Sequence, residues 1–386
     1  MRFSVDAHAM GRHLTGNEVY IRNLLKGFAR FGAGAEFIAY VSMKDAAREI
    51  PVPIRTRQVS NNPFVRLGVD LSRKLREDHP ALVHVQYTAP LRCPAPIIVS
   101  VHDVSFVEHP EFFTRTRALQ LRLTVRRTVC SAARVLTPSD FSRREIARCY
   151  AITPEKIEVI PNAVSSSFRP ISRRNAAEWV RQRFGIQTPY ILTVGDLQPR
   201  KNHAGLIRAY EQLVRNHPEI QHSLVLVGKQ TWHAPQVLEA ARRSGLANRI
   251  VFTGWVNDEE LLQIYGGCDL FVFPSFYEGF GLPILEAMAC GRAVACSGTS
   301  AMPEVADSAA ILFDPRSAEE MVRAMRDVLL DAGLRGRLER LGLQRASLFS
   351  WDRAACQTLD VYYDVAGQSM REHAGRAKSV PVTIHD

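Results

Sequence analysis

Residues 275–291 read SFYEGFGLPILEAMACG and predict a loop followed directly by a helix. Two glycines interrupt any strand here, and Pro283 suits the first turn of a helix, which the following apolar residues continue. This spacing places Glu278 on the loop and Glu286, eight residues later, on the helix.

The chemistry of this segment suits a phosphorylated sugar. Glycines allow close approach of the backbone to a ligand, a helix N-terminus attracts an anion, and two carboxylates can accept hydrogen bonds from sugar hydroxyls. The alternative is a buried strand, a tight turn and a helix that carries two solvated glutamates.

Short apolar runs alternate with helical patterns in two series along the chain. The first series comprises residues 2–6, 37–41, 82–85, 97–101, 134–137 and 157–160. The second comprises residues 190–194, 223–227, 250–252, 270–273, 293–296 and 310–313. This alternation is typical of parallel sheets with crossover helices, so we expect an α/β protein with two doubly wound, Rossmann-like sheets.

The chain length fits two domains, since 386 residues are long for one. We expect an N-terminal domain over residues 1–168, a linker near residues 165–172 and a C-terminal domain over residues 169–349. Residues 350–366 predict a final helix capped by Ser350. Residues 367–386 show no sustained pattern and predict a mobile tail.

Positive charge is concentrated in the first half of the chain. The net charge is +10, and residues 1–170 hold 25 Lys and Arg against 15 Asp and Glu. Such an asymmetry favours an acidic partner, such as an anionic membrane surface, a phosphorylated acceptor or nucleic acid, although general arginine richness would also produce it. The densest run, within residues 115–127, predicts either a basic amphipathic helix for peripheral membrane contact or a helix with its apolar side in the core.

Other composition features exclude several classes of protein. No run of eighteen apolar residues occurs, and Asp6 interrupts the N-terminal segment, so we expect a cytoplasmic protein, peripheral at the inner face of the membrane if it binds there. The seven cysteines are scattered and predict neither disulfides nor a zinc site. No recognised nucleic-acid module is present.

Residues 195–202, GDLQPRKN, follow the expected strand 190–194 and lead into a helix. Arg200 and Lys201 therefore stand at a helix start, where two cations can neutralise a diphosphate and make a nucleotide a good leaving group. The alternative is a solvated basic loop.

These two motifs together resemble glycosyltransferase family 4. E-G-F-G-L-P-x-x-E-A-M-A-x-G is similar to the family's E-x7-E motif, and V-G-x-L-x-P-R-K-N resembles its diphosphate loop. The resemblance implies a GT-B fold, in which two Rossmann-like domains face a cleft. It also implies an acceptor-binding N-terminal domain, a nucleotide-sugar-binding C-terminal domain and a final helix that crosses back to the N-terminal domain. We expect no cofactor besides the substrate nucleotide sugar.

Carried over to this chain, the resemblance implies roles for residues of the C-terminal half. Lys201 and Arg200 would bind the diphosphate, Glu278 would face the donor sugar and Glu286 would hold the ribose. Further donor contacts through main-chain atoms are expected at Gly228, Gly254, Gly279, Phe280, Gly281 and Leu282. One departure is Asp196, which stands where many family members carry an arginine.

In the N-terminal half the resemblance implies four further site residues. Gly16 lies in the first β-to-α turn and would contact the donor phosphate. His102 and Asp103 end an apolar strand beside the donor sugar and acceptor, and Asn162 would lie at the interdomain edge. A structural histidine and a simple turn asparagine are the corresponding alternatives.

The expected reaction is the transfer of a hexose from a nucleoside diphosphate sugar to an acceptor hydroxyl with retention at the anomeric carbon. The resemblance implies front-face departure, in which the leaving phosphate takes the acceptor proton. The sequence has no D-x-D pair, and Arg200 with Lys201 could neutralise the diphosphate, so we expect no metal.

The PRKN loop together with H-D-x-S-F and H-P-E-F-F resembles a branch rich in mannosyltransferases of bacterial surface polysaccharides and lipopolysaccharide. We therefore expect GDP-mannose as donor and a lipid-linked or oligosaccharide acceptor, with a UDP-hexose as the alternative donor. An epimerase or phosphorylase of the same architecture remains open, as does a basic membrane- or nucleic-acid-binding protein without catalysis.

Overall fold

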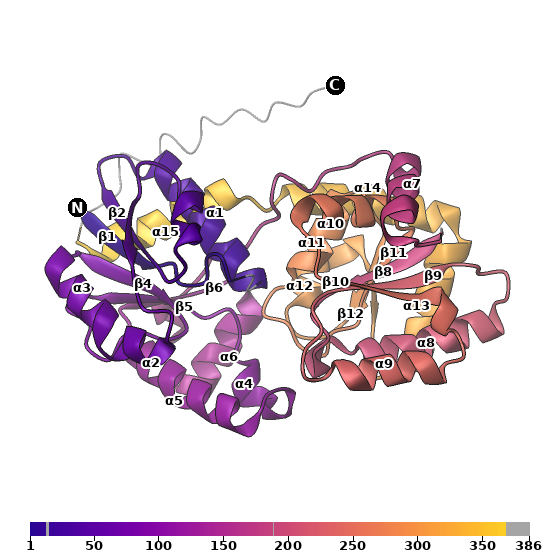
Figure 1. Ribbon diagram of the computed structural model, residues 1–386, viewed down its shortest axis with the longest axis horizontal. Coiled ribbons are helices and arrows are strands. Elements are labelled where there is room, and N and C mark those ends of the chain that lie inside the picture. The colour runs from indigo at the N-terminus through magenta and orange to yellow at the C-terminus, as the bar shows by residue number, and fades with distance from the viewer. Residues whose placement is uncertain (13–14, 188, 368–386) are drawn as a thin grey trace. The chain divides into compact units, whose positions relative to one another are not determined.

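The computed structural model describes residues 1–12, 15–187 and 189–367 (Figure 1). Apart from Gly367, the expected mobile tail 367–386 lies outside the described residues. The chain divides into two compact units, of which unit 1 comprises residues 1–162 with the segment from Ser350, and unit 2 comprises residues 163–349.

Unit 1 contains a parallel sheet of seven strands in the order β3-β2-β1-β4-β5-β6-β7 within the described residues. The strands are β1 Arg2–Asp6, β2 Glu36–Val41, β3 Arg55–Gln58, β4 Leu82–Gln86, β5 Ile97–Ser100, β6 Arg134–Thr137 and β7 Ile157–Val159. The helices are α1 Thr15–Phe31, α2 Pro63–Val65, α3 Leu71–Asp78, α4 Ser105–Glu108, α5 Arg115–Ser131, α6 Asp140–Tyr150 and α15 Trp351–Val365.

Strand β3 is missing from the sequence-based expectation. Its residues, RTRQ, are polar or charged, and it pairs only with β2 at the edge of the sheet. A hydrophobic pattern cannot reveal such a strand, because an edge strand need not bury its side chains. The central strand β4 is buried along its whole length, as expected for a parallel sheet covered on both faces.

Unit 2 contains a parallel sheet of six strands in the order β10-β9-β8-β11-β12-β13 within the described residues. The strands are β8 Tyr190–Val194, β9 Ser223–Val227, β10 Ile250–Gly254, β11 Leu270–Phe273, β12 Val294–Ser297 and β13 Ile311–Phe313. The helices are α7 Arg173–Phe184, α8 His203–Asn216, α9 Ala234–Arg243, α10 Asp258–Gly267, α11 Leu282–Ala289, α12 Met302–Ala306, α13 Ala318–Leu330 and α14 Ala332–Ser347.

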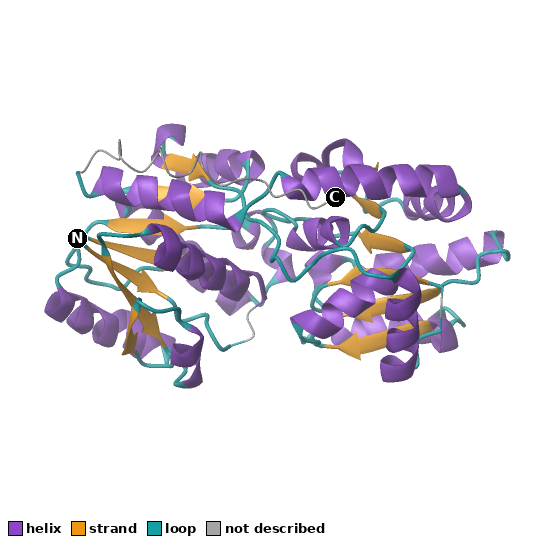
Figure 2. Cartoon of the chain, turned by 90° about the horizontal axis from the view of Figure 1, so that it is seen from above, coloured by secondary structure: helices purple, strands orange, loops and turns teal. Residues whose placement is uncertain are grey.

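Each unit is therefore a Rossmann-like layer of parallel strands with helices on both faces, as Figure 2 shows. In unit 2 the alternate residues of one strand serve separate cores. Tyr190 and Leu192 of β8 pack on one face of the sheet, whereas Ile191 packs on the other. The expected α/β architecture with two doubly wound sheets is confirmed.

The boundary between the units lies six residues before the expected one. The chain enters unit 2 at Ala163 and not at residue 169. The physical reason is Phe168, which is 7% exposed and belongs to the apolar core of unit 2, where Val164 and Ile171 pack against it. The segment 163–168 is thus anchored by burial in unit 2 and does not form a free linker.

The final helix, α15, belongs to unit 1. The hydroxyl of Ser350 accepts a hydrogen bond from the Arg353 amide at its start, and Arg30 of α1 pairs with Asp352 over 2.9 Å. Tyr362 packs edge-on against Phe3 of β1 with ring centroids 5.2 Å apart. Among the helices of residues 1–12, 15–187 and 189–367, none has the length and apolar character of a membrane-spanning segment.

Candidate active site

The loop after β8 brings Arg200 and Lys201 to the carboxyl edge of the unit 2 sheet. Pro199–Lys201 form a single helical turn, and Asn202, in the left-handed conformation with φ 54°, connects that turn to α8. The helix begins at His203, directly after this loop, as the sequence predicts. Ligands of open α/β sheets bind at this edge.

Glu278 lies between these two cations. Its Oε1 is 2.8 Å from Lys201 Nζ and its Oε2 is 2.5 Å from Arg200 Nη1. Burial alone would raise the pKa of Glu278, but the charges of Arg200 and Lys201 lower it to about 2. Burial in turn lowers the pKa of the Lys201 ammonium, and the Glu278 carboxylate opposes that effect. The three side chains form a compact charged cluster with one positive charge in excess.

Glu286 lies on α11, which begins where the sequence predicts. Gly281 precedes the helix with φ 109°, a left-handed conformation that favours glycine. The Tyr265 hydroxyl of α10 donates to Glu286 Oε2 over 2.9 Å. Burial raises the pKa of Glu286 to about 7 despite that hydrogen bond.

The main chain at Gly228 approaches another loop closely. A Cβ at Gly228 would lie 2.1 Å from the carbonyl oxygen of Gly195, so only glycine fits. The Gly228 amide also donates to the Gly254 carbonyl over 3.0 Å. Three successive strand ends, those of β8, β9 and β10, thus present backbone close together. Asp196 accepts a hydrogen bond from the Lys229 amide over 3.0 Å, which assigns a structural role to the residue that departs from the family pattern.

The remaining residues predicted to bind the donor lie in the turn before α11 or at the first position of that helix. Phe280 is buried and packs edge-on against Phe349 with ring centroids 5.7 Å apart. Gly279 lies directly before it, and Leu282 is the first residue of α11. Its amide is one of the first four of the helix, which lack an acceptor within the helix itself.

Two contacts of this cluster were not anticipated. Ser300 accepts a hydrogen bond from the Glu278 amide over 3.0 Å and adopts φ 54°. The second is the hydrogen bond from the Tyr265 hydroxyl to Glu286, a residue of the same sequence motif. A serine in a turn carries no sequence signal, whereas a tyrosine beside the apolar Leu262 and Ile264 of α10 indicates a buried partner for its hydroxyl.

In unit 1, His102 follows β5 and is partly buried. Its Nε2 lies 3.3 Å from Gln86 Oε1, and the Tyr20 ring packs edge-on with centroids 4.6 Å apart. Burial lowers the pKa of His102 to about 4, so the ring is neutral at physiological pH. The neutral ring can donate one hydrogen bond through one nitrogen and accept one through the other.

The other predicted residues of unit 1 have different surroundings. Asp103 Oδ1 accepts hydrogen bonds from both the amide and the hydroxyl of Ser105, over 2.9 and 2.7 Å, at the start of α4. Asn162 is 6% exposed, and its Oδ1 has no hydrogen-bond partner among the described residues. Gly16 was expected in the turn before the first helix, but it lies within the first turn of α1, because that helix already begins at Thr15.

The predicted residues therefore form two groups. Arg200, Lys201 and Glu278 are in direct contact in unit 2, where Glu286 and the glycine-containing loops also lie. The residues of unit 1 are Gly16, His102, Asp103 and Asn162.

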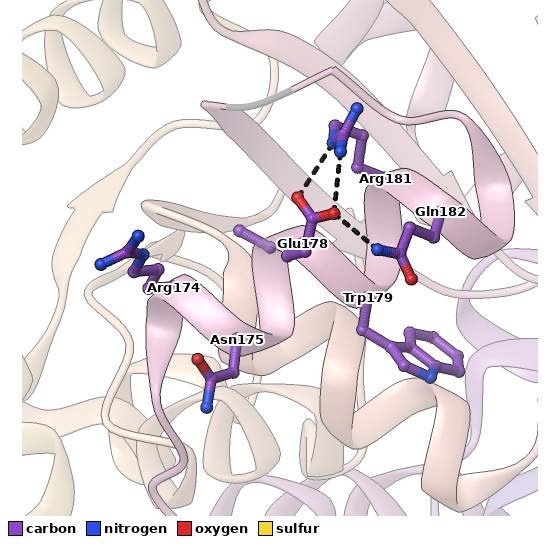
Figure 3. A pocket seen from close by; sticks show the side chains of 7 residues that line it. Arg174, Asn175, Glu178, Trp179, Arg181 and Gln182 are labelled. Atoms are coloured by element: carbon purple, nitrogen blue, oxygen red, sulfur yellow. Dashed lines mark hydrogen bonds and ion pairs between the residues drawn. The ribbon is translucent and has the colours of Figure 1, made fainter.

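Two other features of the surface carry no such chemistry. A hollow along α7 is lined by residues of that helix alone, and its Glu178 pairs with Arg181 over 2.8 Å (Figure 3). Glu108, Glu145 and Cys149 lie close together, but Arg148 forms ion pairs with both glutamates. Neither contains a residue that the sequence indicated.

Comparison with known proteins supplies the family. A family model described as Glycosyl transferases group 1 matches residues 179–345, and one described as Glycosyltransferase Family 4 matches residues 14–168. O-antigen chain mannosyltransferase B of Escherichia coli is 35% identical over 268 residues, 69% of this chain and 69% of that protein. The serotype-specific mannosyltransferase WbdA of Escherichia coli is 31% identical over 245 residues, 63% of this chain and only 30% of that protein.

Among solved structures, HepE of Anabaena in complex with UDP-glucose has a TM-score of 0.75 and 19% identity, covering 94% of this chain and 99% of that one. Two Rossmann-like units with parallel sheets of this kind define the GT-B class of glycosyltransferases. The chain belongs to glycosyltransferase family 4. This membership favours transfer over the epimerase, phosphorylase and non-catalytic interpretations.

Proposed function

We propose that the protein is a retaining, metal-independent mannosyltransferase that moves mannose from GDP-mannose to a hydroxyl of a lipid-linked or oligosaccharide acceptor. The observation that carries this proposal is the cluster of Arg200, Lys201 and Glu278, with contacts of 2.5 and 2.8 Å. The mannosyl donor is supported by the names of the two Escherichia coli relatives, one of which acts on the O-antigen chain.

The diphosphate of the donor takes the place of Glu278 as the partner of the two cations. Guanidinium and ammonium groups form short, charge-assisted bonds with phosphate, and they stabilise the negative charge that develops as the sugar departs. Glu278 is released to accept hydrogen bonds from the sugar hydroxyls. Because two side chains supply the compensating charge, no divalent metal is required.

The rest of the nucleotide binds along the neighbouring strand ends. Glu286 accepts hydrogen bonds from the ribose, and the backbone at Gly228 and Gly254 lies against the base. The amides of Gly279, Phe280 and Gly281 bind the sugar, and that of Leu282 a phosphate oxygen. Unit 2 is accordingly the donor-binding domain.

In unit 1, Gly16 contacts the donor phosphate, and His102, Asp103 and Asn162 serve the acceptor side. The bond between the anomeric carbon and the diphosphate oxygen breaks while a bond to the acceptor oxygen forms on the same face. The acceptor proton passes to the departing phosphate oxygen, so no side chain must act as base. Catalysis then consists of positioning and charge stabilisation.

A UDP-hexose is the second candidate donor, since HepE binds UDP-glucose in a structure of similar fold. A thermal-shift screen with GDP, UDP, ADP and dTDP tests the base, because a ligand at a hundred times its dissociation constant adds about 2.7 kcal/mol of stability. A shift with GDP alone supports the proposal. A larger shift with UDP than with GDP would identify a UDP-hexose as the donor instead of GDP-mannose. The absence of a shift with any nucleotide would refute nucleotide-sugar transfer.

Incubation with GDP-mannose and a mannoside acceptor then tests the chemistry. We expect released GDP and a product with the α configuration of the donor by NMR, and equal rates with and without EDTA. A β-linked product would refute retention, and activity that EDTA abolishes and Mg²⁺ restores would refute metal independence.

We further infer that the protein works in the cytoplasm at the inner face of the membrane in bacterial surface polysaccharide synthesis. Helix α5 leaves Leu119 and Leu123 59% and 63% exposed, although Val129 of the same helix is buried. Arg115, Arg117, Arg122 and Arg126 are exposed around these leucines. Such a surface combines apolar insertion with attraction to anionic lipid.

A further inference from the structure

A buried arginine in unit 1 lacks an obvious partner. Arg66 follows α2 in a π-helical turn, Arg66–Asp70, and is only 5% exposed. Its Nε and Nη1 have no hydrogen-bond acceptor among the described residues. An arginine cannot lose its charge by deprotonation in a protein, so burial without a hydrogen-bonded anion is costly.

Asp6 is the carboxylate that interacts electrostatically with Arg66, but it does not form a hydrogen bond with it. Asp6, at the end of β1, is 1% exposed and its Oδ2 also has no hydrogen-bond partner among the described residues. Its Oδ1 accepts instead from the amide of His8 over 3.2 Å, and His8 Nδ1 lies at the same distance. Burial alone would raise the pKa of Asp6, but the charges of His8 and Arg66 lower it to about 2. Arg66 and Asp6 thus interact through their charges without a hydrogen bond.

A second arginine reaches the same place. Arg12 Nη2 donates to the carbonyl of Asn61 over 2.9 Å, and the next residue, Asn62, caps α2, which Arg66 directly follows. Burial and the charge of Arg66 lower the pKa of Arg12. The neighbouring Glu18 is matched by Arg22 over 2.7 Å. The charges of two guanidinium groups therefore act on one carboxylate without a direct ion pair, and these three groups have one positive charge in excess.

The cluster also lies where a Rossmann-like sheet binds ligands. Strands β1 and β3 run parallel in the order β3-β2-β1, so the segments after both strands emerge at the same edge. Asp6 ends β1, and Arg66 follows β3 by eight residues. A group bound here would be held by unit 1, the unit to which the proposed function assigns the acceptor.

We propose that Arg66 and Arg12 bind a phosphate group of the acceptor substrate, an inference that rests on the proposed function. A phosphate group matches two guanidinium groups better than a single carboxylate does. It offers several oxygens to the forked donors and carries about one to two negative charges. The phosphate belongs either to a lipid-linked diphosphate sugar or to a soluble sugar phosphate. Both present the same chemistry to the two arginines.

Titration with inorganic phosphate at constant ionic strength, followed by ³¹P NMR, tests the site directly. All variants carry Lys201→Ala as well, so that phosphate binding at the donor loop does not contribute to the signal. We expect Arg66→Gln and Arg12→Gln each to weaken phosphate binding at least tenfold. Arg48→Gln, whose arginine is 85% exposed in the same unit, is the matched control and should bind as the parent does. Equal binding in all variants would overturn the proposal, as would binding in none.

Arg66 is buried, so its replacement requires a control for folding. Arg66→Lys keeps the charge but loses the fork, and we expect weakened phosphate binding with an unchanged melting temperature. If Arg66→Gln does not fold, Arg66→Lys and the more exposed Arg12→Gln decide the result. Unchanged affinity in these two variants contradicts the proposal.

Kinetics with three acceptors separate the sources of phosphate. These are a short-chain prenyl-diphosphate-linked sugar, mannose 6-phosphate and methyl mannoside. Arg12→Gln should raise KM at least tenfold for the phosphorylated acceptor that is used, with kcat and the KM for methyl mannoside unchanged. An equal rise for methyl mannoside would refute a phosphate contact.

GDP binding distinguishes this inference from the donor assignment. Arg12→Gln and Arg66→Lys should bind GDP as tightly as the parent protein. If they lose GDP affinity, the arginines serve the donor diphosphate and the acceptor proposal fails. If the parent protein does not bind GDP, the donor proposal is refuted. The phosphate titration would still test the site formed by Arg66 and Arg12.

Discussion

The hydroxyl of Tyr265 donates a hydrogen bond to Oε2 of Glu286 over 2.9 Å, and this contact orients the carboxyl group proposed to hold the ribose. Burial nevertheless raises the pKa of Glu286 to about 7. The carboxyl group therefore titrates close to physiological pH, which has consequences for stability and for binding.

Glu286 should make the protein less stable as the pH rises through neutrality. A folded-state pKa above the unfolded value of about 4.3 means that the stabilising contribution is complete below that unfolded value and is lost as pH rises through about 7. Urea unfolding between pH 5 and pH 8 should show a decline of about 2.5 kcal/mol that Glu286→Gln removes. The exposed Glu259→Gln should retain the decline, and a decline that persists in Glu286→Gln would contradict the assignment.

Lys201→Ala should abolish transfer while the fold is kept. Loss of one charge-stabilising donor at the reacting group typically costs at least about a hundredfold in kcat. Initial rates with GDP-mannose and a melting curve measure both effects, with the exposed Lys26→Ala as the control. Wild-type turnover in Lys201→Ala would rule out the phosphate role.

Glu278→Gln should abolish transfer but bind GDP more tightly. The carboxylate pairs with Arg200 and Lys201 before the nucleotide arrives, so its removal frees both cations for the diphosphate. The same change should lower stability without nucleotide, because two partly buried cations lose their partner. Calorimetric titration with GDP checks the prediction, and weaker GDP binding with an intact fold would argue against competition between Glu278 and phosphate.

The same carboxylate predicts sensitivity to acid. Because its pKa is lowered to about 2, Glu278 contributes stability above its unfolded pKa of about 4.3, and that contribution is lost as pH falls towards 2. The free energy of unfolding should therefore fall less steeply below pH 4 in Glu278→Gln than in the parent protein. Parallel curves would show that the cluster is not coupled to folding.

Gly16→Ala should separate function from folding. A Cβ at Gly16 meets no atom within 4 Å, so the substitution in the first turn of α1 should leave the melting temperature unchanged or raise it slightly. If the donor phosphate approaches this backbone, KM for GDP-mannose should rise. Gly228→Ala gives the contrasting case, because its Cβ would lie 2.1 Å from the Gly195 carbonyl oxygen and should lower stability. Normal kinetics in a stable Gly16→Ala would contradict the phosphate contact.

Helix α5 should bind anionic vesicles through its exposed leucines. Co-sedimentation with phosphatidylglycerol vesicles should fall when Leu119 and Leu123 are both changed to Ser, and binding should weaken with salt because the surrounding arginines contribute. Leu330→Ser changes a leucine of similar exposure, 50%, in unit 2 and should bind normally. Equal sedimentation of the double variant would remove the membrane assignment of this helix.

Local patterns predicted most of the architecture, because buried parallel strands are continuous apolar runs and Gly and Pro end them. The polar edge strand β3 lacks that pattern, and the unit boundary depends on where Phe168 is buried. Similarly, the sequence placed Glu278, Arg200 and Lys201 in two loops 77 residues apart, and the neighbouring strands β8 and β11 bring those loops together.

By itself, then, the sequence determined the class of fold and the residue types of the donor site, since both follow from short-range spacing and from motifs. Only the tertiary structure decided which charges meet. The pairing of Glu278 with two cations, the raised pKa of Glu286 beside Tyr265 and the burial of Arg66 near Asp6 all depend on burial and on distances between residues remote in sequence. Electrostatic interaction depends on separation and on exclusion of water, and neither is encoded in local pattern.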